Sequence, residues 1–570
     1  MSHAPRFRRL SVLSLSLALA SGFAGRGLAA DEPARPRLLV VVSVDQLPYE
    51  YLLRMRRGFA DDGFFNTVAK QGATYSSAHH GQAYTITAPG HSVLLSGAYP
   101  STTGIIGNDW FDRTTGKSTY CVADADVTVV GKESLSAPVA ESMSPKNLEI
   151  GTLGDQLKLA SNKRSKVFGI AIKDRAAILM AGHAADAAYW NDVKSGFWVS
   201  STYYGKPRLP DYLDAYNTTG KVKALGGGEW TLLLAEDKYE RYYPDDAEFE
   251  TKVKVLGNKF PHPLPAGDDP RLGDTLPFSP RGNDMTLDIA RLLVTEEKLG
   301  GDDDVDLLCV NLSSNDYVGH AYGPYSLEVQ DMTYRTDRQL GEFVKFLDAQ
   351  VGAGKWTLAL SSDHGICPMP EMAKLFGLPG RRVGGDQFKE LKKSIEAELT
   401  KQFGAPQESG KTYVLNCDAT SLYLNDELPE LAGERFGAAQ RIARELIAAN
   451  DAVAVAFTRD ELTRGGNETE LFRRMTMAFH PRRSGDVLYC LKPYHIPSAK
   501  EAPSSGTTHG SPWEYDTHVP VLLLGAGITP GVYDRMVSPP MIAPTLARIA
   551  KVDAPSGCTV EPLHEALGGK

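Results

Sequence analysis

Five short apolar segments, rich in β-branched residues, constrain the fold more than any other feature of this chain. They are residues 38–44, 166–172, 305–311, 356–362 and 519–524. Continuous apolar runs of this length are typical of strands buried on both faces of a parallel sheet. Stretches with apolar residues at helical spacing, such as 151–161 and 328–350, lie between them. We therefore predict an α/β fold with a mostly parallel sheet sandwiched by helices.

Two segments interrupt this alternation and predict additions to the core. Residues 189–280 are rich in Trp, Tyr, Gly and charged residues, which indicates a cap or insertion. Residues 387–494 begin with an amphipathic helical pattern and continue with short strands and a second helix, which indicates an inserted α+β lobe. The core would then consist of residues 37–188, 281–386 and 495–570.

The first 30 residues have the pattern of a signal peptide. Arg6, Arg8 and Arg9 precede an apolar stretch, and small residues follow up to the cleavage site expected after Ala30. The apolar run is short for a spanning helix, although an uncleaved membrane anchor is the alternative. We expect a periplasmic or secreted protein, exported by the Sec or the twin-arginine route, with no stable membrane insertion.

Composition excludes some functions and leaves others open. The chain has 570 residues, a net charge of −9 and no dense Lys/Arg run beyond the leader, which argues against nucleic-acid binding. Its six cysteines form no C-x-x-C pair. Export permits disulfides, but the sequence fixes neither their pairing nor the oligomeric state.

Carboxylates and imidazoles follow several of the predicted strands. Asp45 follows the first strand, Asp316 and His320 follow the third, and Asp363 and His364 follow the fourth. Ligands of open α/β sheets bind at the carboxyl ends of strands, so these side chains should meet in one cleft. Oxygen and imidazole ligands are those that a pair of zinc ions requires. Capping aspartates and surface histidines are the alternative interpretation of each motif taken alone.

The spacing of Asp316 and His320 fits one helical turn. Gly319 and Gly323, however, favour a loop over a regular helix in this segment.

The segment Thr87-Ala88-Pro89-Gly90-His91 supplies a candidate nucleophile. Its Pro-Gly pair predicts a sharp turn that exposes Thr87 Oγ1 at a helix N-terminus, where backbone N–H groups would face a phosphate. A threonine hydroxyl is a poor nucleophile at its ordinary pKa, and a zinc ion would supply the activation. His91 falls past the turn on the expected helix and is interpreted as structural.

Two basic side chains and one amide are candidates for binding a phosphoryl group. If the backbone is extended, Lys173 and Arg175 face the same side and point together into the cleft. Two cations suit the oxygens of a phosphoryl dianion, whereas the alternative is a charged strand end paired with Asp174 and solvent. Asn108, which follows Gly107, is either a further donor or an ordinary turn residue.

Taken in order along the chain, these motifs resemble those of the alkaline phosphatase superfamily. The resemblance is carried by Asp45, Thr87-x-Pro-x-His91, Gly107-Asn108, Lys173-x-Arg175, Asp316-x-x-x-His320, Asp363-His364 and His509-Gly510. More narrowly, the chain is similar to phosphate-irrepressible alkaline phosphatases with a threonine nucleophile, which are close kin of nucleotide pyrophosphatases/phosphodiesterases. The similarity spans the first strand to the last apolar run, with the late lobe as an insertion.

The resemblance implies two zinc ions and a set of ligands for each. One ion would be held by Asp316, His320 and His509. The other would be held by Asp45, Asp363, His364 and the Thr87 oxygen. His518 is a rival to His509 as the last ligand, and the His-Gly turn of related phosphodiesterases favours His509. Manganese or cobalt could replace zinc at such ligands.

The resemblance also implies an activity. Asn108, Lys173, Arg175 and the backbone N–H of Ala88 would bind the phosphoryl oxygens, and Thr87 would form a phosphothreonine intermediate. We expect an exported zinc-dependent alkaline phosphatase acting on small-molecule phosphate monoesters, because two cations favour a dianion.

Four alternatives remain, and they differ in how well they fit. The nearest is a phosphodiesterase or nucleotide pyrophosphatase on the same scaffold. A sulfatase would need a C/S-x-P-x-R turn, which the Thr87 segment lacks, and a cofactor-independent mutase usually works in the cytosol, which the leader contradicts. A non-catalytic, metal-stabilised binding protein of the cell envelope is the alternative from a different class.

Overall fold

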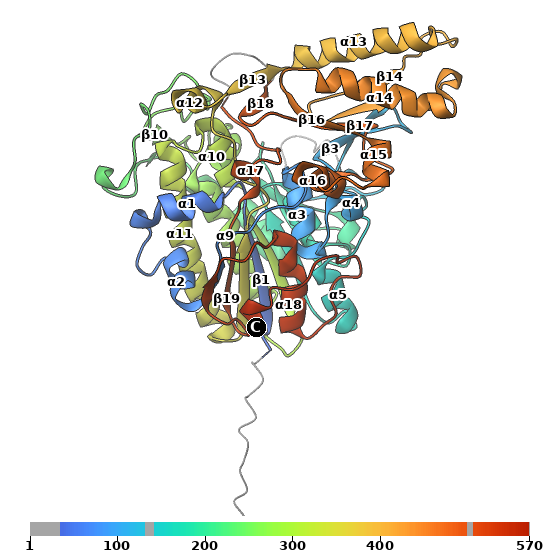
Figure 1. Cartoon of the computed structure of the whole chain (residues 1–570). Coiled ribbons are helices and arrows are strands. Elements are labelled where there is room, and N and C mark those ends of the chain that lie inside the picture. The colour runs from blue at the N-terminus through green and yellow to red at the C-terminus, as the bar shows by residue number, and fades with distance from the viewer. Residues whose placement is uncertain (1–34, 132–141, 499–505, 569–570) are drawn as a thin grey trace, which may run out of the picture.

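The computed structural model describes residues 35–131, 142–498 and 506–568, so the expected signal peptide, residues 1–30, lies outside the described residues (Figure 1). Ten strands form a central sheet: β1 Leu38–Val44, β2 Ala73–Tyr75, β5 Val129–Val130, β6 Val167–Ala171, β7 Ala187–Asp192, β8 Phe197–Ser201, β11 Asp306–Leu312, β12 Trp356–Ser361, β19 Val521–Gly525 and β20 Gly531–Tyr533. Their order across the sheet is β20-β2-β19-β12-β1-β11-β6-β7-β8-β5.

The centre of the sheet is parallel, as predicted. β1 pairs in parallel with β11 on one side and β12 on the other, and β6 and β7 continue the parallel arrangement. The expectation of a parallel strand at residues 519–524 is wrong, because β19 runs antiparallel to both β12 and β2. A buried apolar run has the same composition in either direction, so its sequence does not encode the direction of pairing.

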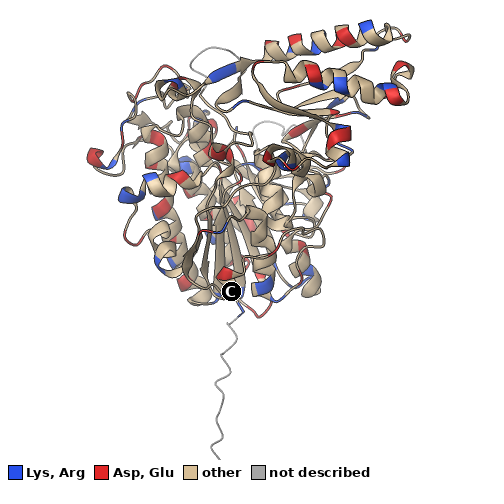
Figure 2. Cartoon of the chain, in the orientation of Figure 1, with Lys and Arg blue, Asp and Glu red and all other residues tan. Residues whose placement is uncertain are grey.

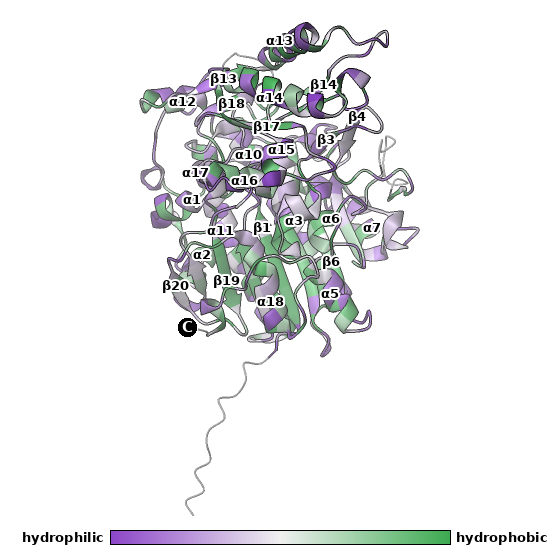
Figure 3. Cartoon of the chain, turned by 45° about the vertical axis from the view of Figure 1, so that its right-hand side comes forward, coloured by the Kyte–Doolittle hydropathy of each residue, from purple (hydrophilic) through white to green (hydrophobic). Residues whose placement is uncertain are grey.

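Alternate residues of β1 enter different layers of the core. Val40 and Val42 pack on one face with α2 (Phe64–Gln71), α9 (Pro280–Glu296) and α11 (Leu327–Leu347). Leu39 and Val41 pack on the other face with α5 (Leu153–Ala160) and α18 (Ile542–Ala550). Figure 3 shows the apolar strands between these helices. The helices predicted at 151–161 and 328–350 are α5 and α11.

The segment predicted as a cap begins inside the sheet. β7 and β8 both belong to the ten-stranded sheet, so the boundary placed between residues 188 and 189 cuts through β7. Beyond them lie short elements: α7 Asp211–Thr218, β9 Glu229–Trp230, β10 His262–Pro263 and α8 Leu272–Thr275. Trp230 anchors this part by donating from its indole to Asp331 on α11 at 2.6 Å.

Residues 387–494 fall within a lobe that has its own core. Four strands pair in the order β14-β15-β17-β16 (Val414–Cys417, Ser421–Leu424, Val487–Leu491, Val453–Thr458), with α13 (Gly385–Phe403) and α14 (Glu434–Ala448) packed on them. The two connections to the core, β13 (Arg381–Gly384) and β18 (His495–Ser498), pair in parallel just outside the predicted boundaries. Figure 1 places the lobe beyond the carboxyl end of β1.

The remaining helices are short and lie around the sheet and lobe. They are α1 Tyr49–Arg54, α4 Pro100–Thr103, α12 Pro370–Leu375, α15 Arg459–Arg464, α16 Glu470–Ala478 and α17 Glu514–Thr517. Across the described residues, helices with the length and apolarity needed to traverse a bilayer are absent. All six cysteines are unpaired. Figure 2 shows acidic and basic positions interspersed on the helices, while the sheet is largely uncharged.

Candidate active site

Three carboxylates meet where the central parallel strands end. Asp45 directly follows β1, Asp363 follows β12, and Asp316 lies on α10 (Ser314–Tyr322), the helix after β11. All three are almost completely buried. The predicted convergence of strand-end ligands is therefore present in the structure.

The expectation of a loop around Gly319 is wrong, because α10 is a regular helix there. Its turn places His320 Nε2 3.2 Å from Asp316 Oδ1. Gly319 serves close packing instead: a Cβ at this position would lie 1.8 Å from Gln46 Oε1. Gly323 ends the helix with a positive φ of 84°.

Asp316, His320 and His509 form one group of possible metal ligands, whose ligand atoms all lie within 4.8 Å of one another. His509 Nε2 lies 3.7 Å from Asp316 Oδ1. His518 faces elsewhere, because its Nε2 lies 2.9 Å from the Ser76 carbonyl and its ring stacks on His79. The geometry thus favours His509 over His518.

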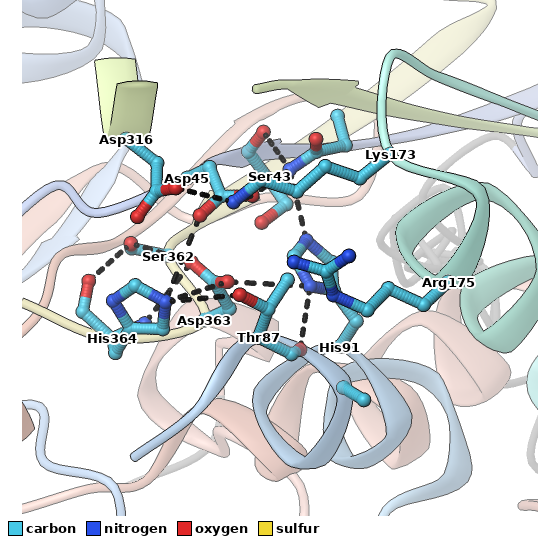
Figure 4. A network of polar contacts seen from close by, with 12 residues as sticks. Ser43, Asp45, Thr87, His91, Lys173, Arg175, Asp316, Ser362, Asp363 and His364 are labelled. Carbon is cyan, nitrogen blue, oxygen red and sulfur yellow. Dashed lines mark hydrogen bonds and ion pairs between the residues drawn. The ribbon is translucent and has the colours of Figure 1, made fainter. Parts of the chain in front are cut away.

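Asp45, Asp363 and His364, the second expected set of ligands, lie together in Figure 4. The ligand atoms of Asp45, Asp316 and His364 also all lie within 4.8 Å of one another. His364 Nε2 lies 3.2 Å from Asp363 Oδ2 and 3.7 Å from Asp45 Oδ1. Asp45 Oδ1 and Asp363 Oδ2 are buried and lack a hydrogen-bond partner among the described residues. Because His364 Nδ1 donates to the Gly365 carbonyl at 2.9 Å, the neutral ring presents a lone pair at Nε2. Three lone pairs directed at one space fit a cation, so these residues suit a metal ion.

The other two candidate imidazoles are held in the same way. His320 Nδ1 lies 2.7 Å from the Thr507 carbonyl, and His509 Nδ1 lies 2.8 Å from the Thr85 carbonyl. A backbone acceptor on Nδ1 fixes the tautomer and leaves Nε2 free to bind a metal. All three imidazoles are therefore oriented as metal ligands.

The charges in this cluster are unbalanced without added cations. Burial and the nearby Asp363 carboxylate raise the pKa of Asp45 well above its usual range. Burial alone would disfavour the His364 imidazolium, but Asp363 and Asp45 raise the pKa of His364 to about 9. Burial would also raise the pKa of Asp316, yet His320 and Lys173 hold it well below its usual range. The cluster thus attracts positive charge strongly.

Thr87 lies at a helix N-terminus, as the sequence predicts, because it is the first residue of α3 (Thr87–Ser96). The sharp turn expected at Pro89-Gly90 is wrong, since both residues continue the helix. Thr87 Oγ1 lies 3.5 Å from His364 Nε2 and is buried beside the second ligand group. Gly90 permits this approach, because a Cβ there would lie 2.2 Å from the Asp363 carbonyl oxygen. The glycine of the motif is thus required for packing against the metal-ligand loop.

His91 is in α3, close enough to Asp45 and Asp363 to be a third possible ligand group. Both of its ring nitrogens already have partners: Nδ1 donates to the Thr87 carbonyl at 2.8 Å, and Nε2 accepts from Asn311 Nδ2 at 2.9 Å. Burial lowers the pKa of His91 to about 4, which keeps the ring neutral in this arrangement. These contacts support a structural role for His91.

Lys173 is the N-cap of α6 (Asp174–Ala181) and has the extended backbone that was assumed, but Arg175 lies in the first turn of the helix, so the extended backbone expected over both residues is wrong. Lys173 Nζ lies 3.0 Å from Asp45 Oδ2 and 2.6 Å from Asp316 Oδ2, between the two ligand groups. Arg175 reaches toward Thr87 in Figure 4, and its buried Nε has no hydrogen-bond partner among the described residues. Lys173 thus lies among the candidate ligands, and Arg175 extends toward the nucleophile, both from the start of α6.

Asn108 contacts the same turn. Its Oδ1 accepts a hydrogen bond from the Ala88 backbone N–H at 2.9 Å. That N–H, expected to bind a phosphoryl oxygen, is therefore paired with Asn108 in this structure. The contact places the Asn108 amide next to Thr87.

One central residue was missed by the sequence analysis. Gln46 donates from its backbone N–H to Asp363 Oδ1 at 3.1 Å and from Nε2 to Asp316 Oδ1 at 2.6 Å. It adopts a positive φ of 62°, which is unusual for a residue other than glycine. Its only signal in the sequence is its position directly after Asp45.

Comparisons with known proteins agree with this geometry. Residues 39–381 match the model of the type I phosphodiesterase / nucleotide pyrophosphatase family. The chain is 35% identical over 545 residues to a protein of Myroides odoratus named calcium-transporting ATPase, covering 95% of this chain and 96% of that protein. It is 33% identical over 560 residues to alkaline phosphatase PafA of Elizabethkingia meningoseptica, covering 97% and 98%.

A crystal structure of PafA superposes with a TM-score of 0.82 at 32% identity, covering 94% of this chain and 99% of that one. The family match, the full-length relatives and the shared fold agree with the order of the motifs. The chain therefore belongs to the type I phosphodiesterase / nucleotide pyrophosphatase family, within the alkaline phosphatase superfamily.

Proposed function

We propose that this chain is an exported alkaline phosphatase that hydrolyses small-molecule phosphate monoesters and uses two zinc ions. The observation that carries the proposal is the position of Thr87 Oγ1, 3.5 Å from His364 Nε2 in a cluster of buried carboxylates that Lys173 also contacts, with Arg175 extending toward it in Figure 4. Similarity to PafA, an alkaline phosphatase, supports the reaction class. Export rests on the leader pattern of the first 30 residues.

Two groups of residues would hold the cations. Asp316, His320 and His509 would form one site, and Asp45, Asp363, His364 and the Thr87 oxygen would form the other. Mixed imidazole and carboxylate ligands favour zinc. When bound, such ions act as Lewis acids that stabilise negative charge on the attacking and leaving oxygens.

The chain's own residues then define the reaction. Thr87 Oγ1 loses its proton and attacks phosphorus, and the ester P–O bond breaks with its electron pair going to the departing alcohol oxygen. Water hydrolyses the resulting phosphothreonine, releasing phosphate and restoring the Thr87 hydroxyl. Lys173, Arg175 and Asn108 bind the phosphoryl oxygens and fix the phosphorus in line with Oγ1.

Charge favours a monoester over a diester. A phosphate monoester is a dianion near neutral pH, whereas a diester carries one negative charge and a second substituent. Lys173 and Arg175 supply two positive charges on the side where that substituent would lie. A substrate of the nearest alternative, a phosphodiesterase or nucleotide pyrophosphatase, would bring one negative charge to these two cations instead of two.

Rates on p-nitrophenyl phosphate and bis-p-nitrophenyl phosphate test the proposal. We expect the zinc-loaded enzyme to have the higher kcat/KM on the monoester. Lys173→Ala and Arg175→Ala should lower the monoester value by on the order of 10²-fold and the diester value much less. Faster diester turnover by the wild-type enzyme would instead favour the phosphodiesterase alternative.

A further inference from the structure

Arg175 follows Asp174 in the chain, yet the two side chains do not form an ion pair. The Asp174 carboxylate accepts the Arg175 backbone N–H at 2.6 Å, while the guanidinium donates from Nη1 to the Tyr120 hydroxyl at 3.3 Å. A carboxylate and a guanidinium that both contact one hydroxyl are close enough to pair directly, so their separation needs a cause.

Tyr120 supplies that cause, because its hydroxyl lies between the two charged groups. It donates to Asp174 Oδ1 at 2.6 Å and accepts from Arg175 Nη1. Burial, reinforced by the Asp174 charge, raises the pKa of the Tyr120 hydroxyl, so it remains a donor at any assay pH. The carboxylate is thus satisfied by the phenol rather than by the guanidinium.

We propose that Tyr120 is a positioning residue whose hydroxyl holds Arg175 apart from Asp174, leaving the guanidinium free to bind phosphoryl oxygens. This inference rests on the proposed function, which assigns Arg175 to the phosphoryl group. The unpaired Nε of Arg175 fits the role, since a buried N–H without a partner is available to a ligand.

A direct Arg175–Asp174 pair would have two effects on phosphate binding. A bidentate pair consumes two of the parallel N–H donors with which a guanidinium binds phosphate. It also places a negative charge against the group that must attract a dianion. The phenol avoids both effects, because it uses one donor and carries no charge.

The backbone holds Tyr120 close to Asn108, another residue proposed to bind phosphate. Tyr120 ends β4 (Lys117–Tyr120), which pairs with β3 (Asp109–Asp112) in a hairpin that begins directly after Asn108. The Cys121 N–H donates to the Asn108 carbonyl at 2.8 Å and closes the base of this hairpin. One hairpin therefore positions Asn108 itself and, through Tyr120, the side chain of Arg175.

Substitution of Tyr120 by phenylalanine tests the inference with little change in volume. We expect Tyr120→Phe to lower kcat/KM on p-nitrophenyl phosphate by about 3–10-fold, the effect of one lost hydrogen bond. The Kd of inorganic phosphate, measured by calorimetry on the zinc-loaded protein, should rise by the same factor. The matched control is Tyr216→Phe, which removes another phenol bonded to a carboxylate, Asp288, and should change neither value.

Two double variants separate positioning from a merely structural role. In an Arg175→Ala background, Tyr120→Phe should change kcat/KM by less than about twofold, because the group it positions is gone. In a Tyr120→Phe background, Asp174→Asn should restore part of the lost activity, because the residue that captures Arg175 is neutralised. An equal loss in the Arg175→Ala background, or no recovery with Asp174→Asn, would overturn the inference.

Failure of this inference is distinguishable from failure of the proposed function. If the enzyme prefers diesters, the monoesterase proposal falls, but phosphate binding still reports whether Tyr120 acts through Arg175. If monoester hydrolysis is confirmed and Tyr120→Phe binds phosphate as the wild type does, only the positioning role is lost.

Discussion

At the scale of single residues, Thr87 is the group on which the chemistry depends. Its Oγ1 is the hydroxyl beside His364 at the N-terminus of α3, and the side chain is almost completely buried. We expect Thr87→Ala to lower kcat at least on the order of 10³-fold, since the substitution removes the attacking hydroxyl. Thr87→Ser, which keeps the hydroxyl, should retain much of the activity.

Zinc content and phosphate affinity should be measured together with the kcat of Thr87→Ala. Both should remain largely intact in Thr87→Ala, because the carboxylates and imidazoles of each ligand group stay in place. Wild-type kcat in the alanine variant would show that the nucleophile is wrongly assigned.

The sequence predicts the site residues better than it predicts their surroundings. Asp45, Asp363 and His364 meet because strand ends share one edge of a parallel sheet, which is a property that apolar patterns reveal. The role of Gln46 as a donor to two carboxylates cannot be predicted from the sequence, because it depends on a positive φ and on contacts with distant segments. Such contacts appear only when the chain is folded.

At the scale of elements, the β3–β4 hairpin connects the site with the inserted lobe. Arg113, at the tip of the hairpin, donates from Nη2 to Asp486 Oδ2 at 2.6 Å and from Nη1 to the Leu424 carbonyl at 2.7 Å. Asp486 is 1% exposed and also lies 3.1 Å from Arg459 Nε. A largely buried ion pair between Arg113 and Asp486 therefore connects the hairpin to the lobe.

Removing this contact should destabilise the protein without unfolding it. We expect Arg113→Ala to lower the free energy of unfolding by about 1–3 kcal/mol, because Asp486 loses one charged donor and keeps Arg459. Denaturant titration followed by fluorescence measures the change. The exposed pair of Arg208 and Asp211, 3.9 Å apart, offers a control, since Arg208→Ala should have almost no effect. Equal stability of the two variants would contradict the role of the hairpin contact.

The sequence predicts helices and strands correctly where the spacing of apolar residues is regular. It does not predict the pairing direction of a strand or its place in a sheet, which depend on neighbouring strands. Helices α5 and α11 follow from the spacing of their apolar residues. β19 was expected to be parallel because its composition matches that of the central strands, and only pairing with β12 and β2 sets its direction. Most of β7 and all of β8 fall in the segment predicted as a cap because their aromatic and polar residues differ from those of the central strands, yet both strands extend the sheet.

At the scale of the whole molecule, the folded state concentrates negative charge at the carboxyl edge of the sheet. Asp45, Asp316 and Asp363 come from three separate segments and become buried together on folding, with Lys173 as the buried basic residue between two of them. Packing these carboxylates side by side costs free energy unless cations are bound. Metal binding and global stability should therefore be linked.

Removal of metal tests that linkage. A cation that binds only the folded state stabilises it by about 2.7 kcal/mol at one hundred times its Kd, so two sites together contribute roughly twice that amount. We expect chelation to lower Tm clearly and added zinc, but not calcium, to restore it, as followed by differential scanning calorimetry with metal analysis. His320→Ala, which removes one partly buried ligand, should show a smaller zinc-dependent shift than the wild type. A Tm that does not respond to chelation, together with a zinc content near zero in the purified protein, would show that the clustered carboxylates are not a metal centre. The alternative of a non-catalytic binding protein of the cell envelope would then gain support.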